Sequence, residues 1–253
     1  MKKHPRQARV VEMIERSGYV SVGDAAAALA VTMQTIRRDF DELIRIGSII
    51  RHRGGATPNV SGKVSSYMIR QAYLREVKQR IARLLVTRLP SGATIFIQNG
   101  TTLEAVGPLL ATAGLRRLVT NHINLAMFVA NQGHTPVGIP AGEVRRADGA
   151  IVGEQVSVSL RDYRFDIALI GAAAVDSTGA VLDHELTDVM IARTVMARAE
   201  TSILVVDSTK FRHTAPLCVA PIDGFSAVVT EAPPPEAICR MLRQANVALH
   251  LAD

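Results

Sequence analysis

Residues 32–43, TMQTIRRDFDEL, combine a hydroxyl suited to helix capping, an apolar stripe and two adjacent arginines. A threonine hydroxyl such as that of Thr32 can accept a hydrogen bond from a backbone N–H of the first helical turn. Ile36, Phe40 and Leu43 recur at three- and four-residue intervals, which is typical of one buried helix face. The stretch therefore predicts a helix that starts after Thr32 and packs on one side.

The neighbouring segments extend this helix into a helix-turn-helix arrangement. Residues 6–18 have a helical apolar period, and an alanine-rich helix is predicted at about 23–30, separated from the third helix by a tight turn. Residues 48–58, SIIRHRGGATP, predict a short hairpin with a basic tip and a Gly-Gly turn. We therefore expect a winged helix-turn-helix domain over residues 1–57.

The polar residues at the start of the third helix are expected to face away from its apolar stripe. In a helix-turn-helix these first turns enter the major groove of DNA, and basic wing residues can contact phosphate. We interpret Arg38 as a base contact and Arg37, on the flank, as a phosphate contact; taken alone, both could belong to a solvated charged face. The predicted DNA-binding residues are Thr32, Met33, Gln34, Thr35, Arg37, Arg38, Arg51 and Arg53.

The charge distribution sets the first third of the chain apart. Residues 1–80 hold 15 of the 29 Lys and Arg residues but 7 of the 23 Asp and Glu residues. This excess predicts a polyanionic partner, and nucleic acid is favoured over a membrane surface because no strongly apolar face opposes the basic one. No apolar run approaches a membrane span, and Cys218 and Cys239 lack metal-binding spacing. We expect a cytoplasmic protein without a metal or cofactor.

Residues 20–56, VSVGDAAAALAVTMQTIRRDFDELIRIGSIIRHRGGA, resemble the N-terminal signature of the DeoR family of bacterial transcriptional regulators. In that family a Thr-Ile-Arg-Arg-Asp segment, here residues 35–39, lies in the recognition helix, and an Arg-x-His-Gly-Gly-Ala run closes the wing. Arg53 stands where the family usually has His. Because a cation is retained, phosphate contact by the wing is expected to survive.

Residues 58–66 are rich in Pro, Gly and Ser and predict a linker to a second domain over residues 67–253. That domain is expected to begin with a basic amphipathic helix at 67–89. Six short apolar segments then alternate with helical stretches, which indicates an α/β fold with a mainly parallel sheet covered on both faces. The predicted strands are residues 93–97, 116–120, 135–139, 166–170, 202–206 and 226–230.

Polar residues follow several of these strands, at the edge where parallel α/β sheets bind ligands. The loop at residues 98–102, Gln-Asn-Gly-Thr-Thr, could hold a phosphate through its amides and hydroxyls, with Lys210 as a cation. Each residue also has a structural interpretation, since Gly100 could serve a tight turn, Asn121 a helix cap, and Lys210 could be a surface lysine. We predict a small phosphorylated or otherwise anionic ligand. The predicted effector-binding residues are Asn99, Gly100, Thr101, Thr102, Asn121, Gly142 and Lys210.

This half also resembles the DeoR family, whose sensor domain is similar to ribose-phosphate isomerases and, in many members, binds a sugar phosphate. The matching landmarks are residues 99–102, Thr120-Asn121, Gly142 with Gly153, Gly171 and residues 207–211. The resemblance implies a regulator of carbohydrate catabolic genes, most often a repressor, that binds operator DNA as a dimer or tetramer. Departures from the family pattern, which bear on the ligand that fits, stand at Gln98, Ala141, Asp188 and Ala192.

The alternative is an active sugar-phosphate isomerase fused to a DNA-binding module. Isomerisation needs a general base and a general acid placed around the sugar. Residues 172–176 read Ala-Ala-Ala-Val-Asp where the related isomerases carry an acidic cluster, and Lys210 alone cannot supply both proton transfers. A regulator without catalysis is therefore favoured, while Asp183, His184 and Glu185 keep the enzyme hypothesis open.

Overall fold

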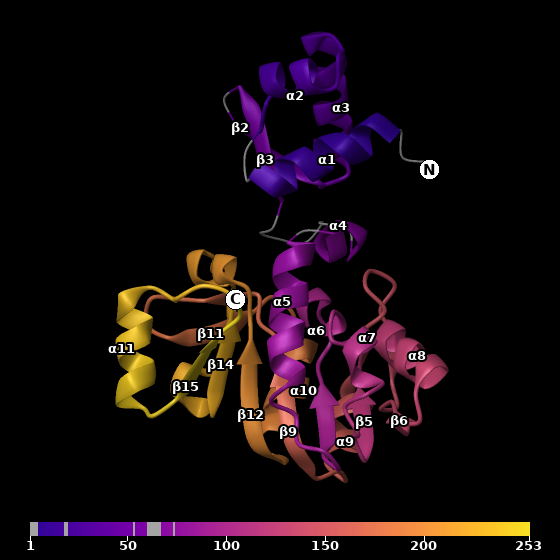
Figure 1. Cartoon of the computed structure of the whole chain (residues 1–253), viewed down its shortest axis with the longest axis vertical. Coiled ribbons are helices and arrows are strands. Elements are labelled where there is room, and N and C mark those ends of the chain that lie inside the picture. Colours follow the sequence, from indigo (N-terminus) through magenta and orange to yellow (C-terminus); the bar gives the residue numbers. More distant parts are fainter. Residues whose placement is uncertain (1–4, 18–19, 53, 60–66, 73) are drawn as a thin grey trace. The chain divides into compact units, whose positions relative to one another are not determined.

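The computed structural model describes residues 5–17, 20–52, 54–59, 67–72 and 74–253. The chain divides into two compact units, Met1–Arg75 and Glu76–Asp253 (Figure 1). Residues 67–75 belong to the first unit, although the sequence had placed them in the second domain. Most of the expected linker, residues 60–66, lies outside the described residues.

The described residues of the first unit form helices and a small antiparallel sheet of strand order β1-β3-β2. Strands β2 and β3 form the hairpin expected for the wing, with Arg51 opposite Ala56 in the register. The elements are α1 Pro5–Ser17, β1 Val20–Ser21, α2 Val22–Ala28, α3 Met33–Arg45, β2 Ile49–His52, β3 Gly55–Pro58 and α4 Tyr67–Ala72.

Helix α3 begins where the capping pattern predicted. The Thr32 hydroxyl accepts a hydrogen bond from the backbone N–H of Thr35 at 3.2 Å. Ile36, Phe40 and Leu43 are buried, which confirms the predicted apolar stripe. They pack with α1 and α2 in one core, whose other buried members are Val10, Val11, Ile14, Val20, Ala25, Ala26, Ile49 and Ala56.

The second unit contains a seven-stranded parallel sheet of order β15-β14-β12-β9-β4-β5-β6. Its strands are β4 Thr94–Ile97, β5 Arg117–Thr120, β6 Val137–Gly138, β9 Phe165–Ile170, β12 Ala199–Val205, β14 Ala227–Thr230 and β15 Ala248–Leu251. Six of them coincide with the predicted strands. The seventh, β15, follows the last helix and was missed by the sequence analysis.

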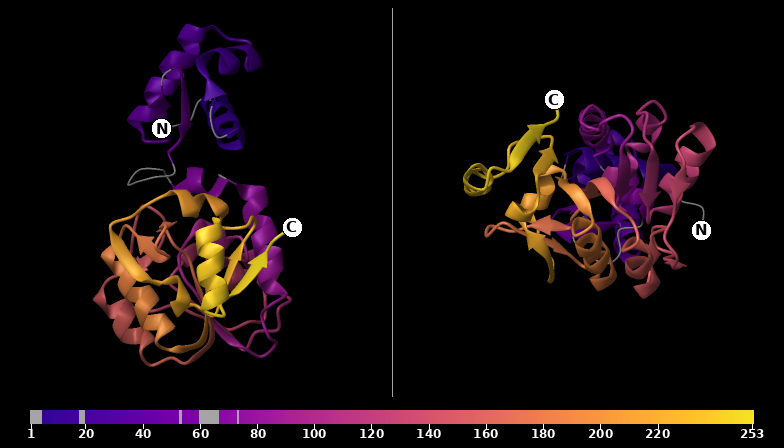
Figure 2. Two further views of the ribbon diagram at one scale, coloured as in Figure 1. Left: turned by 90° about the vertical axis from the view of Figure 1, so that its left-hand side faces the viewer. Right: turned by 90° about the horizontal axis from the view of Figure 1, so that it is seen from below.

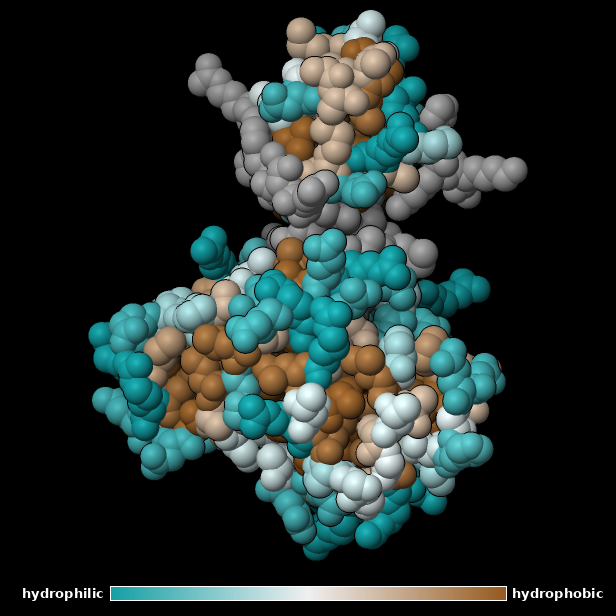
Figure 3. All heavy atoms as spheres, viewed as in Figure 1, coloured by the Kyte–Doolittle hydropathy of each residue, from teal (hydrophilic) through white to brown (hydrophobic). Residues whose placement is uncertain are grey.

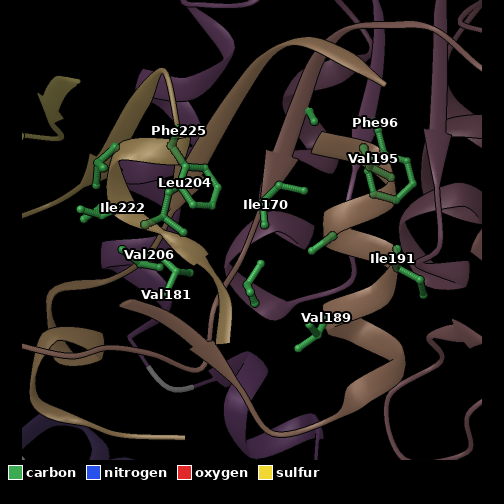
Figure 4. Close-up of a cluster of buried hydrophobic side chains, with 14 of the residues drawn as sticks. Phe96, Ile170, Val181, Val189, Ile191, Val195, Leu204, Val206, Ile222 and Phe225 are labelled. Atoms are coloured by element: carbon green, nitrogen blue, oxygen red, sulfur yellow. The ribbon is translucent and has the colours of Figure 1, made fainter. Parts of the chain in front are cut away.

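Helices cover both faces of this sheet, as the uninterrupted apolar strands had predicted. One face packs against α5 Arg75–Val86, α6 Thr101–Glu104, α7 Gly107–Leu110 and α8 Ile123–Gln132. The other packs against α9 Glu154–Leu160, α10 Leu186–Met196 and α11 Glu236–Gln244. Figure 2 shows the layers from two further directions, and Figure 4 shows side chains of α10, such as Val195, among those of the strands, such as Ile170 and Leu204.

Two smaller antiparallel sheets lie outside the central sheet and were not predicted. Strands β10 Ala174–Val175, β11 Ala180–Asp183 and β13 Leu217–Pro221 form one of them, and β7 Glu143–Val144 pairs with β8 Ile151–Val152 in the other. Short 3₁₀ turns follow β12 (η1 Ser208–Arg212) and β13 (η2 Ile222–Gly224). Both sheets emerge from segments that follow strands of the central sheet.

The long amphipathic helix expected at 67–89 is interrupted. It consists of α4 and α5, and Leu74 between them has a φ of 53°, in the left-handed region that breaks a helix. The break falls at the boundary between the two units. Figure 3 shows hydrophilic side chains along α5, with hydrophobic surface on both sides of them.

Candidate functional sites

The outer face of α3 presents the residues that the sequence assigned to DNA. Thr32, Met33, Gln34, Arg37 and Arg38 are exposed, and Met33 retains 55% of its accessible surface. Within the described part of the chain, neither Arg37 nor Arg38 forms an ion pair, so both guanidinium groups are available to a partner. Thr35 is half-buried, and its hydroxyl lies 2.9 Å from that of Thr32.

The wing brings a further cation to the same helix. Nη2 of Arg51, at the end of β2, lies 2.5 Å from Oδ1 of Asp41, an exposed residue of α3. An exposed ion pair of this kind contributes little stability, so a DNA phosphate can compete for the guanidinium group. Arg53, the second wing cation of the prediction, lies outside the described residues.

A partly buried ion pair fixes the back of α3 and was not anticipated. Asp39 lies on the inner side of the helix and is 3% exposed. Its Oδ2 accepts from Nε of Arg6 in α1 at 2.6 Å, and its Oδ1 accepts from Nη2 of the same arginine at 3.1 Å. The geometry is the bidentate one that favours Arg and carboxylate pairs. Asp39 therefore orients α3 on α1 and is not a DNA contact.

In the second unit, the loop after β4 is held by side chains from neighbouring strands. Oδ1 of the fully buried Asn121, which follows β5, accepts from the backbone N–H of Asn99 at 2.8 Å, and its Nδ2 donates to Ile151 at 3.3 Å. Nε2 of Gln98 donates to the carbonyl of Asp188 at 3.1 Å, and its Oε1 accepts from the Gly171 N–H at 3.2 Å. These bonds fix the loop at the edge of the sheet formed by the carboxyl ends of the parallel strands. We call this edge the carboxyl edge.

A buried lysine also reaches this loop, and the sequence analysis did not single it out. Lys78, in the first turn of α5, is 4% exposed and its Nζ donates to the Thr101 hydroxyl at 3.0 Å. A buried ammonium group beside a glycine and hydroxyl loop is suited to a phosphate. A signal was present, because Lys78 precedes Ile81, Ala82 and Leu85 on the buried stripe of its helix, a position normally apolar.

An ion cluster lies beside the same loop. Arg145, after β7, donates to both carboxylate oxygens of Asp148 at 2.9 Å, and its Nη2 also lies 2.9 Å from Oδ2 of Asp188 in α10. Nδ2 of Asn99 donates to Oδ2 of Asp148 at 3.1 Å. The cluster therefore joins three segments that are distant in the sequence. Of its members, the sequence analysis had noted Asn99 as a ligand residue and Asp188 as a departure from the family.

The two carboxyl groups that bind Arg145 have pKa values shifted in opposite directions. Burial raises the pKa of Asp188 to about 6, and the charges of Asp183 and Asp148 add to this effect, although Arg145 opposes it. Burial also disfavours the charged form of Asp148, but the hydrogen bonds and charge of Arg145 outweigh it and lower the pKa of that residue. Burial likewise raises the pKa of Asp183. Arg145 is thus mainly the counter-ion of Asp148.

Two other predicted ligand residues, Gly142 and Lys210, have their own local surroundings in the described part of the chain. A Cβ on Gly142 would lie 2.6 Å from the Val152 carbonyl oxygen and 2.7 Å from Cγ2 of Val156, so glycine is required there for close packing of the β7–β8 hairpin. Lys210 lies in η1 after β12. Burial of His213 lowers the pKa of that residue, and the positive charge of Lys210 lowers it further. Within the described part of the chain, no hydrogen bond joins Lys210 to residues 99–102.

Comparison with known proteins places both units in one family. A DeoR-like helix-turn-helix domain matches residues 6–61, and a DeoR C-terminal sensor domain matches residues 74–232. The chain belongs to the DeoR family. The resemblance noted in the sequence is thereby confirmed.

Several relatives of this DeoR-family protein match over nearly their whole length. The glycerol-3-phosphate regulon repressor of Escherichia coli K12 is 34% identical over 99% of this chain and 100% of that protein. The repressor of the same name from Haemophilus influenzae is 32% identical, over 100% and 98%. The transcriptional repressor CsqR of E. coli K12 is 29% identical, over 98% and 95%. These relatives are named as repressors and not as enzymes, as expected for this DeoR-family protein.

Among solved structures, ribose 5-phosphate isomerase A from Neisseria gonorrhoeae has a TM-score of 0.40 to this DeoR-family chain at 18% identity, and the overlap covers 54% of this chain and 53% of that one. In the described segments, no helix is both long and apolar enough to cross a membrane. The same segments contain no group of three or more His, Cys, Asp or Glu side chains that could hold a metal ion.

Proposed function

We propose that this chain is a transcriptional repressor that binds operator DNA through α3 and the wing of its N-terminal unit. The observation that carries the proposal is that Arg37 and Arg38 are exposed and, among the described residues, form no ion pair. They lie on a capped helix whose opposite face is held by the ion pair of Asp39 and Arg6. A helix fixed in this way can present its first turns to the major groove. The naming of relatives as repressors supports the same function.

The DNA-binding assignment is tested by substituting the two arginines separately. Arg38→Ala is expected to lower affinity for the operator by about 1–3 kcal/mol with little effect on random DNA, because a bidentate contact to a base edge is lost. Arg37→Ala is expected to weaken both complexes and to reduce the salt dependence of binding, as the loss of a phosphate contact does. Titration by fluorescence anisotropy at several salt concentrations measures both. Equal losses on operator and random DNA for Arg38→Ala would mean that Arg38 reads no base.

The sensor domain is proposed to bind a small phosphorylated metabolite at the carboxyl edge. Lys78 and Thr101 would hold the phosphate together with the backbone N–H of Gly100, while Asn99 offers its side chain. A Cβ at Gly100 would meet no atom within 4 Å, so there is space beside the loop. Asn121 would act through the loop that it supports. Thr102 and Lys210 complete the proposed set, Lys210 as a cation at the same edge, while Gly142 serves packing. Two relatives carry glycerol-3-phosphate in their names, which supports this ligand class.

Regulation then follows from unequal affinity of the ligand for two states of the protein. The DNA-competent state is proposed to be a dimer or tetramer, because paired recognition helices match two operator half-sites. The test is release of a labelled operator by phosphorylated sugars and polyols, with the oligomer mass measured by light scattering in the same buffers. A protein that binds operator DNA but is unaffected by any phosphorylated compound would refute the sensor assignment.

A further inference from the structure

Two buried acceptor oxygens at the carboxyl edge have no hydrogen-bond partner within the described part of the chain. They are Oδ1 of Asn99, in the loop after β4, and Oδ1 of Asp188, in the first turn of α10. Asp188 is 9% exposed, and its Oδ1 is buried. A buried acceptor without a donor is unfavourable, and a native site that keeps two of them needs an explanation.

Both oxygens belong to the same cluster. The other side-chain atoms of these residues are occupied: Nδ2 of Asn99 donates to Asp148 at 3.1 Å, and Oδ2 of Asp188 accepts from Arg145 at 2.9 Å. Arg145 and Asp148 are themselves joined at 2.9 Å, so a continuous chain of bonds links the two unpaired oxygens. Gln98, the neighbour of Asn99, also bonds the backbone of Asp188 at 3.1 Å. The loop and α10 therefore each contribute one of these acceptors to the cluster.

The charge of the cluster decides what could satisfy them. The charges of Asp148 and Asp183 both act on Asp188, and Arg145 is the cation that contacts Asp148 and Asp188. Nε and Nη2 of Arg145 already bind the two carboxylates. A ligand that brings another carboxylate would add a negative charge to this acidic site, whereas a hydroxyl group would donate a hydrogen bond without adding charge.

We propose that Oδ1 of Asn99 and Oδ1 of Asp188 accept hydrogen bonds from two hydroxyl groups of the effector. The site then selects phosphorylated polyols and rejects compounds of the same size in which a terminal hydroxymethyl group is oxidised to a carboxylate. This inference rests on the proposed phosphate site formed by Lys78 and Thr101. It adds the rule that the end of the ligand away from the phosphate must carry hydroxyl groups and not a carboxylate.

Matched pairs of compounds test the rule. Isothermal titration of the full-length protein at about pH 8 compares glycerol 3-phosphate with glycerate 3-phosphate, and glucitol 6-phosphate with gluconate 6-phosphate. Inorganic phosphate serves as the reference for the phosphate end alone. In at least one pair the polyol is expected to bind at least about tenfold more tightly than its acid, because a site built to receive a hydroxyl discriminates strongly against its replacement.

Two variants assign the discrimination to the named oxygens. Asp188→Asn retains the shape but removes the charge and supplies an amide donor, so it is expected to strengthen binding of the acid and to reduce the ratio within the pair several-fold. Asn99→Ala removes the other acceptor and is expected to weaken the polyol without strengthening the acid. Asp162→Asn, at an exposed residue outside the site, is the matched control and should leave the ratio unchanged. Circular dichroism establishes that each variant is folded, and either site variant alone suffices if the other does not fold.

The outcomes separate the inference from the function on which it rests. Equal or tighter binding of the acids, or an unchanged ratio in a folded Asp188→Asn variant, overturns the hydroxyl rule and leaves the phosphate site in place. Binding of inorganic phosphate without binding of any polyol also overturns the hydroxyl rule and leaves the phosphate site in place. If none of the five compounds binds, the phosphate site fails, and the inference fails with it.

Discussion

Asp188 should make the sensor domain less stable at neutral pH than it would be with an uncharged residue. A carboxyl group in an unfolded chain has a pKa of about 3.9, whereas Asp188 in the fold has a pKa of about 6. The folded state therefore holds the proton more tightly, and the free energy of unfolding falls as pH rises from about 4 to about 6, then levels off. Two pKa units correspond to roughly 3 kcal/mol, which is an upper bound for the cost of the charged form.

Asp188→Asn removes this cost while its side-chain oxygen can still accept from Arg145. We expect the variant to be more stable than the parent by up to about 3 kcal/mol at pH 8, with the difference about 2 kcal/mol smaller at pH 4.5. In a chain of 253 residues this corresponds to a rise in Tm of roughly 6–12 °C at pH 8. Thermal melts followed by circular dichroism across this pH range measure it. A variant whose stability parallels that of the parent at every pH, or falls below it at pH 8, would refute the assignment.

Three further substitutions test other parts of the structure. Lys78→Met should weaken binding of inorganic phosphate by about tenfold or more, because the buried ammonium group is lost; unchanged titration heats would remove Lys78 from the site. Gly142→Ala should destabilise the sensor domain by about 1–3 kcal/mol through its clash with the Val152 carbonyl, whereas Gly224→Ala, where the nearest atom is 3.7 Å away, should change the Tm little. Phe40→Ala should cost about 3–5 kcal/mol in urea unfolding of the N-terminal unit, and a loss below 1 kcal/mol would contradict the burial of Phe40.

The sequence predicted well those features that depend on local periodicity. The Thr32 cap and the stripe of Ile36, Phe40 and Leu43 repeat along one helix, so their spacing alone specified which side is buried. Six parallel strands were recognised for a similar reason, because strands buried on both faces are apolar throughout. Strand β15 was missed because the polar His250 interrupts its short apolar run.

The polar contacts of the sites were harder to predict because they join distant segments. Asp39 pairs with a residue 33 positions away, and Arg145 reaches Asp188 across 43 positions. No periodicity marks such pairs, and a charged residue in a sequence does not indicate whether its partner is protein or ligand. Gly142, which was predicted as a ligand residue, is required by the packing of the β7–β8 hairpin, and its place in the sequence did not indicate this requirement.

The position of Lys78 in the chain also bears on how a signal could leave the sensor. Helix α5 starts at Arg75, which is the last residue of the first unit, and Lys78 follows within a single helical turn. The bond from Lys78 to Thr101 thus ties the ligand loop to the covalent connection between the units. A shift of Thr101 would reach that connection through one hydrogen bond and three peptide units, without any rearrangement of the sheet. We therefore expect that substitutions at the start of α5, other than at Lys78, can abolish induction while both ligand affinity and operator affinity stay intact.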